Sequence, residues 1–414
     1  MREHLHIQEG FGPLQEDAEI ELRPLTIFFG PQGSGKSLVS QVLYFFRDAP
    51  YLLSRYGGEA TSAAALVRKV VQGIRAGDSP ARWLTAFLSK RTVHLSYTES
   101  QTQRKLSFRR DTREIVPLQP FAHEIAKWVL TWREDPQQRP RERRALFIPA
   151  ERVLLSRFVN TESALLAHDA VPYTLREFAF FLQAMAERWF QGDRESFPYE
   201  EDAEEIRKWT QDALGGHERY EGQGPFAGKW QWAFTAPEGK RERKMEIEMA
   251  ATGQMEAWPL IFTARVLAAA DKERVSVPSF IHLEEPEAHL HPRAQVRLAW
   301  VLARLVRLGF RVLVTTHSLT FLYAVNNLIL AHKLFNTATD AEPPLQAPPK
   351  ACWLSPEQVR AYVFDLEAIR TAMNEKGEIE ESLLSEVLGR LEEEYYALWS
   401  LAVKTASHPP EERV

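Results

Sequence analysis

Hydrophobic positions recur with two periods along the chain, and the mixture predicts an α/β protein. Residues 18–29 read as two strands interrupted at Pro24, and the second, 25–29, is almost wholly apolar, as expected of a buried central strand. Similar apolar runs occur in ALFIPAER (145–152), SFIHLEE (279–285) and RVLVTTHS (311–318). Such runs predict further strands of the same buried sheet.

Helical periodicity and strict alternation occupy separate parts of the chain. TLREFAFFLQAMAERWF (174–190) and AQVRLAWVLARLVRLG (294–309) predict amphipathic helices, as do residues 62–89 and the tail at 380–403. Alternation between Thr92 and Val116, and again over 228–249, predicts antiparallel strands. We therefore expect an α/β fold with a mixed sheet, an antiparallel β subdomain and a compact helical insertion.

Four segments follow from this reading. Residues 1–152 would form a first lobe with an antiparallel region, and 153–250 a helical insertion with a strand segment. Residues 251–335 would complete the core, and 336–414 would be a proline-rich linker and a helical tail.

Composition narrows the class of protein. The 414 residues are 44% hydrophobic, enough for a large core, and the net charge of -5 gives no global basic field. One cysteine excludes a disulfide framework. The N-terminus has no apolar signal region, and no run approaches the roughly 20 apolar residues of a membrane span. We expect a cytoplasmic protein without membrane contact.

A glycine loop follows the most apolar strand. GPQGSGKS (30–37) fits Gly-x-x-x-x-Gly-Lys-Ser and precedes a helical segment, the context that a phosphate-binding loop requires. Its N–H groups and the helix N-terminus would hold ATP phosphates. Lys36 would neutralise the β- and γ-phosphates, and Ser37 would bind Mg²⁺. The residues expected to contact the nucleotide are Gly30, Pro31, Gln32, Gly33, Ser34, Gly35, Lys36, Ser37 and Leu38. A glycine turn with an incidental Lys-Ser is the alternative.

Two adjacent carboxylates end a second strand. Hydrolysis of a phosphoanhydride needs one acid for the metal shell and another to orient or deprotonate water. We assign Glu284 to Mg²⁺ and Glu285 to catalysis as the base. A solvated acidic turn is the alternative, and a zinc site at His289 and His291 is another.

Two further motifs are weak in isolation. His317 ends a buried strand and could contact a γ-phosphate. AATGQ (250–254) places a glycine at a helix N-terminus, which can bind an anion.

Taken in order, these motifs resemble those of ATP-binding-cassette ATPases over residues 18 to about 330. LEEPEAHLHP and FIPAER look like the soluble branch with SMC-type, RecF-type and OLD-type ATPases, which includes ATPases of bacterial defence systems such as Septu and PARIS. The resemblance implies an ATPase head that stacks head to tail with a second copy and encloses two ATP molecules.

The resemblance also implies roles for individual residues. Thr252, Gly253 and Gln254 match the signature loop, which would reach the γ-phosphate of the other subunit. Glu285 matches the catalytic glutamate and His317 the switch histidine. The sequence departs from the family pattern at three positions. Glu284 replaces the usual Asp, His291 replaces an interface Asp, and Glu151 takes the place of the lobe-connecting glutamine that binds cofactor.

The resulting hypothesis is a Mg²⁺-dependent ATPase that acts as a dimeric switch or clamp. It would be a homodimer or higher homo-oligomer in phage defence or DNA maintenance, with a separate nuclease or toxin as effector. The alternatives are the nucleotide-driven subunit of a membrane transporter and a phosphotransferase. Basic clusters at 104–105, 109–110, 139–144 and 240–244 could bind nucleic acid or form a solvated face.

Overall fold

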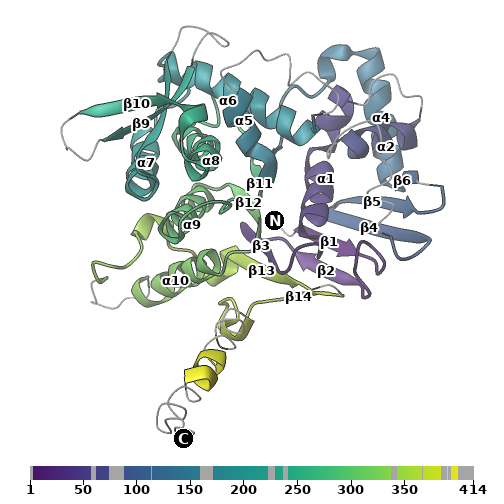
Figure 1. The fold of residues 1–414 in the computed structure, drawn as a ribbon. Coiled ribbons are helices and arrows are strands. Elements are labelled where there is room, and N and C mark those ends of the chain that lie inside the picture. The colour runs from purple at the N-terminus through teal and green to yellow at the C-terminus, as the bar shows by residue number, and fades with distance from the viewer. Residues whose placement is uncertain are drawn as a thin grey trace, which may run out of the picture.

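A six-stranded mixed sheet organises the fold, as the computed structural model of the chain shows (Figure 1). The strands, in spatial order, are β14 (Ile369–Thr371), β13 (Val359–Phe364), β3 (Leu25–Phe29), β12 (Arg311–Thr316), β11 (Phe280–Glu284) and β7 (Ala145–Ile148). The five from β13 to β7 are parallel, and β14 pairs antiparallel to β13 at one edge. The predicted fold class is confirmed.

The structure describes residues 3–56, 62–73, 88–112, 114–158, 171–221, 229–235, 241–336, 343–365, 367–383, 389 and 393–399. Parts of the predicted helices at 62–89 and 380–403 therefore lie outside the described residues.

Each central strand contributes alternate side chains to two separate cores, because side chains point to opposite faces along a strand. In β3, Leu25, Ile27 and Phe29 belong to one core, whereas Phe28 belongs to the other. Burial on both faces explains why this strand is almost wholly apolar rather than alternating.

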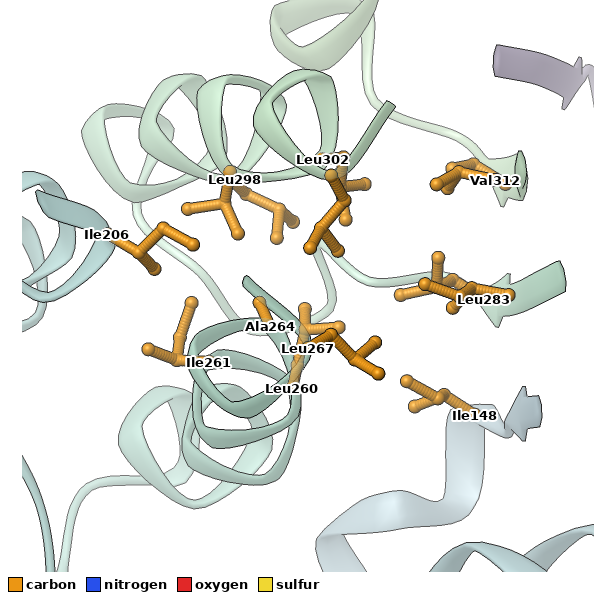
Figure 2. Packing of buried hydrophobic residues seen from close by; sticks show 14 of the residues in the cluster. Ile148, Ile206, Leu260, Ile261, Ala264, Leu267, Leu283, Leu298, Leu302 and Val312 are labelled. Carbon is orange, nitrogen blue, oxygen red and sulfur yellow. The ribbon is translucent and has the colours of Figure 1, made fainter. Parts of the chain in front are cut away.

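Helices α8 (Thr252–Ala269) and α9 (Pro292–Arg307) fill the first core. In Figure 2 the labelled side chains of these two helices converge with those of the sheet: Leu260, Ile261, Ala264, Leu267, Leu298 and Leu302 lie near Ile148, Leu283 and Val312. Helix α8 is apolar on nearly all sides because it is buried from Met255 onward. The remaining helices of this side are α5 (Val153–Phe158), α6 (Tyr173–Phe190), α7 (Glu200–Leu214) and α10 (Leu319–Phe335).

Helix α1 (Lys36–Tyr56) covers the opposite face and packs against an antiparallel sheet. That sheet has the order β2 (Ala18–Glu21), β1 (Glu3–Ile7), β4 (Thr92–Glu99), β5 (Thr102–Arg109) and β6 (Glu114–Leu118). Helices α2 (Ala63–Gly73) and α4 (Phe121–Glu134) lie beside it. The antiparallel region predicted from 92 to 116 is present.

The insertion between β7 and β11 is helical with a small sheet. Its three antiparallel strands are β8 (His217–Glu221), β9 (Lys229–Thr235) and β10 (Glu242–Glu246). A 3₁₀ turn, Ile247–Met249, then leads into α8. Figure 1 shows this insertion on the opposite side of the molecule from α1 and the five-stranded sheet.

Strand β13 is the main departure from expectation, since we predicted only a linker and a helical tail over 336–414. It pairs in parallel with β3, the strand that leads into the phosphate loop, from Val359 opposite Leu25 to Val363 opposite Phe29. A segment remote in sequence thus completes the sheet beside the glycine loop.

Candidate nucleotide-binding site

The phosphate loop lies at the carboxyl edge of the parallel sheet, where β11 and β12 also end. The register places Glu284 opposite Thr315, and Thr316 opposite Phe29. Three adjacent strands therefore bring the loop, the acidic pair and His317 to one edge, which is where open α/β sheets bind ligands.

One pocket contains eight of the sixteen predicted site residues. Its lining consists of Gly12, Pro13, Gln32, Gly33, Gly35, Lys36, Ser37, Leu38, Glu285 and His317. Gly12 and Pro13, which precede β2, were not predicted to belong to it. Two catalytic candidates from separate strands thus face the same space as the phosphate loop.

Lys36 is folded back onto its own loop. Its Nζ donates hydrogen bonds to the carbonyl oxygens of Gly30 (3.0 Å) and Pro31 (2.7 Å). Burial lowers the pKa of Lys36 to about 8, and the charges of Glu285 and Glu287 oppose that shift. A phosphate would supply the anionic partner that this buried ammonium lacks.

The loop backbone depends on glycine at its start. Gly30 has φ +135°, and a Cβ there would lie 2.0 Å from the carbonyl oxygen of Phe364 in β13. Gly33 also has a positive φ, +76°, but a Cβ there would meet nothing within 4 Å. Glycine at position 30 is therefore required by its φ and by its close packing, whereas glycine at position 33 is favoured by its φ alone.

Glu285 has an unusual backbone conformation. Its φ is +42°, a region that non-glycine residues seldom occupy and that is often retained at functional sites. Its Oε1 lies 3.5 Å from Nε2 of His317, the pairing expected of a base and its neighbour. The side chain is 39% exposed, so water can reach it.

Glu284 is buried beside the loop. Its Oε1 accepts a hydrogen bond from Nε2 of Gln41 at 3.0 Å, and Ser37 and the main chain of Ala150 also bond to it. Burial, and then the charge of Glu151, raise the pKa of Glu284 to about 7.

The donor set at Glu284 fits a divalent cation. These hydrogen-bonding partners are all neutral, so none of them compensates the charge of the buried carboxylate. A carboxylate next to the Ser37 hydroxyl offers the oxygen ligands that Mg²⁺ prefers. Glu284 and Ser37 could therefore hold Mg²⁺ as predicted.

Glu151 lies in a 3₁₀ turn (Ala150–Arg152) after β7 and is exposed. It does not line the pocket, but its charge acts on Glu284. Its position next to the metal-site carboxylate is compatible with the lobe-connecting role, which remains a prediction.

Thr252, Gly253 and Gln254 form the first turn of α8 and do not line the pocket of their own chain. Gly253 packs closely, since a Cβ there would lie 2.6 Å from the carbonyl oxygen of His289. Gln254 donates from Nε2 to Leu214 O at 2.9 Å and accepts from Ala251 N at 3.0 Å. Thr252 is exposed and can meet another molecule.

The two loop histidines have separate contacts. His291 caps α9, where its Nδ1 accepts a hydrogen bond from Arg293 N at 3.2 Å. His289 Nδ1 lies 3.5 Å from Glu256 Oε1. Within the described ranges no three His, Cys, Asp or Glu side chains gather as a metal cluster.

Three residues that contact the candidate site were not predicted from the sequence. Glu287 Oε1 accepts hydrogen bonds from Thr316 Oγ1 (2.6 Å) and His317 N (2.8 Å), which ties the two strand ends together. Gln41 lies one helical turn after Ser37, a spacing that could have indicated it. Arg152, whose guanidinium bonds the main chain of Glu284 and Glu285, lies in no sequence motif that would have indicated this contact.

Each basic cluster has at least one cation paired with a carboxylate of the same chain. The pairs include Arg104 with Glu124, Arg109 with Glu114, Arg144 with Glu99 and Lys244 with Glu221. These pairs reduce the positive charge that remains available to a nucleic-acid backbone.

None of the helices in the described parts of the chain has the length and apolar character needed to cross a bilayer.

The order of the parallel strands and the glycine loop between β3 and α1 are those of a P-loop NTPase fold. In agreement, a family model described as "AAA ATPase domain" matches residues 182–322. The match covers about a third of the chain, includes Glu285 and His317, and does not include the phosphate loop. Residues 182–322 are thus similar to an AAA ATPase domain.

Solved structures of SMC heads show a distant likeness. An Smc head bound to the C-winged helix domain of ScpA has 14% identity and a TM-score of 0.43, covering 78% of this chain and 91% of that chain. An Smc head with an extended coiled coil bound to the C-terminal domain of ScpA, from Pyrococcus furiosus, has 12% identity and a TM-score of 0.44, with coverages of 94% and 99%. The SMC head domain from Thermotoga maritima has 12% identity, a TM-score of 0.37 and coverages of 90% and 99%. A search of curated proteins gave no match to the sequence.

Proposed function

We propose that the protein hydrolyses ATP to ADP and phosphate and uses the reaction as a switch. One observation carries the proposal: the phosphate loop, Lys36, Glu285 and His317 line a single pocket although they come from three strand ends. A glycine turn with an incidental Lys-Ser would not explain that convergence.

The chemistry assigned to this pocket is attack of water on the γ-phosphorus. The bond between that phosphorus and the β–γ bridging oxygen breaks, and ADP leaves. Glu285 orients the water and takes its proton, while His317, held through its main chain by Glu287, faces the γ-phosphate. Lys36 leaves the loop carbonyls for phosphate oxygens. Mg²⁺ held by Ser37 and Glu284 would neutralise charge on the β- and γ-phosphates.

Glu285→Gln tests the base assignment. The amide preserves size but cannot accept the proton, so kcat should fall at least about 100-fold while ATP still binds. Hydrolysis is measured by phosphate release and binding with a fluorescent ATP analogue. Glu195→Gln is the control, because Glu195 is 84% exposed and pairs with Arg274 at the surface. A Glu285→Gln enzyme with wild-type turnover would rule out this base.

The switch is proposed to work through self-association. Thr252 is exposed and its turn does not line the pocket of its own chain, so it is available to a second copy. Two copies arranged head to tail would then share each nucleotide, and hydrolysis would remove the shared γ-phosphate.

The biological setting proposed is phage defence or DNA maintenance with a separate nuclease or toxin as effector. Its support is the resemblance of LEEPEAHLHP and FIPAER to the soluble branch of these ATPases. The matched AAA ATPase domain does not favour the transporter alternative. Co-purification of Glu285→Gln with products of neighbouring genes, with and without ATP, tests the effector. Recovery of a membrane permease instead would overturn this setting.

A further inference from the structure

Arg152 is a buried arginine that no part of the proposed chemistry uses. Its side chain is 1% exposed, and its guanidinium donates to main-chain carbonyls from three segments. The acceptors are Glu256 O (3.1 Å, from Nε), Pro149 O (3.2 Å, from Nη1), Glu284 O (2.9 Å, from Nη1) and Glu285 O (3.0 Å, from Nη2). One planar group thus fixes the end of β7, the end of β11 and the first turn of α8 relative to one another.

Glu285 depends on such support. Its backbone is in the left-handed region, which a non-glycine residue keeps only when its surroundings hold it there. Its N–H donates to Thr315 O at 2.9 Å, and its carbonyl accepts from Arg152. The peptide groups on both sides of the catalytic candidate are therefore anchored.

The start of α8 is anchored to the same guanidinium. Glu256 lies one turn after Thr252, and its Oε2 is 3.4 Å from Arg152 Nε. Its other oxygen is 3.5 Å from His289 Nδ1, in the loop that follows Glu285. Movement of this first turn would displace the Glu256 carbonyl and, through Arg152, the Glu285 carbonyl.

We propose that Arg152 is a positioning residue that couples the first turn of α8 to Glu285. The inference rests on the proposed function, in which Thr252 meets the nucleotide of the partner subunit and Glu285 serves the nucleotide of its own. Arg152 then connects the two nucleotide sites of a dimer. Only a guanidinium can do this, because a lysine ammonium cannot reach four carbonyls in a fixed plane.

Arg152→Lys separates positioning from general stabilisation. We expect kcat to fall roughly 10- to 100-fold, with KM and the affinity for a non-hydrolysable ATP analogue within about twofold of wild type. Arg104→Lys is the matched control, since Arg104 is also buried and donates to Phe46 O and to both oxygens of Glu124. The control should lose stability but keep kcat. Wild-type kcat in Arg152→Lys would overturn the proposal.

A second measurement does not require hydrolysis. In Arg152→Lys the amides of 285–290 and of the first turn of α8 should exchange with deuterium faster, whereas Arg104→Lys should leave them unchanged. Unchanged exchange at both segments would also overturn the coupling. If the wild-type protein proves inactive, the proposed function fails, while the exchange data still decide the role of Arg152.

Glu256→Gln covers the case in which Arg152→Lys does not fold. The amide keeps the volume and the main-chain carbonyl but removes the charge facing Arg152 and His289. We expect a smaller loss of kcat, about 3- to 10-fold, at unchanged nucleotide affinity. A kcat equal to wild type would contradict the coupling.

Discussion

At the scale of single residues, buried carboxylates have environments that their sequence positions do not disclose. Asp48 lies inside α1 with non-helical dihedral angles, two residues before Pro50, and marks a kink. Its Oδ1 accepts a hydrogen bond from Arg144 N at 2.8 Å, which ties the helix to the start of β7. Burial raises the pKa of Asp48 to about 8, although the bonds from Arg144 and Ala145 oppose the shift.

This raised pKa predicts a pH dependence of stability. The folded state holds the proton more tightly than the unfolded state, so the contribution is complete below about pH 4 and is lost as pH rises toward 8. Asp48→Asn removes this titration, and the variant should gain stability relative to wild type by about 1.4 kcal/mol per pH unit in that window. Denaturant unfolding from pH 5 to 9 measures the gain, with Glu195→Gln as control. A constant difference across the range would refute the shift.

At the scale of elements, the local sequence pattern correctly predicted the strands and helices whose formation is determined by neighbouring residues. The strand at 25–29, the helix that begins at Lys36 and the helix at 174–190 were predicted correctly because their signals lie within a few residues. Strand β13 was not predicted, because its place beside β3 is decided by pairing across the whole chain. The proximity of Glu285 and His317 could be predicted because both residues follow the ends of buried strands. The contacts of Arg152 and Glu287 could not, because they depend on side-chain geometry that sequence spacing does not reveal.

The close contact between β13 and the phosphate loop predicts that substitutions at two glycines of the loop will differ in their effect on stability. Gly30→Ala would force a Cβ against Phe364 O, whereas Gly33→Ala has a positive φ but open space. Gly30→Ala should therefore cost at least about 2 kcal/mol more stability than Gly33→Ala. Thermal unfolding without nucleotide compares the two. Equal losses would show that backbone strain alone matters and that β13 can move away.

At the scale of the whole molecule, the exposed start of α8 predicts how copies associate. Thr252→Arg adds bulk and charge at a solvent-exposed position, so the monomer should remain folded. In the Glu285→Gln background with ATP, light scattering should show a dimer or larger assembly, and the added Thr252→Arg should abolish it. Thr112→Arg, at an exposed position in the turn between β5 and β6, is the matched control. An assembly that persists in Thr252→Arg would place the interface elsewhere.

The order in which the chain is made bears on when the nucleotide site can form. Gly30 leaves the ribosome early, yet it packs against the carbonyl of Phe364, which is synthesised more than three hundred residues later. Until that strand emerges, β3 remains the edge of an incomplete sheet with unpaired backbone groups. ATP capture should consequently be a late event of biosynthesis, and a premature stop codon between Ser318 and Val359 should abolish nucleotide binding although every motif residue has been translated.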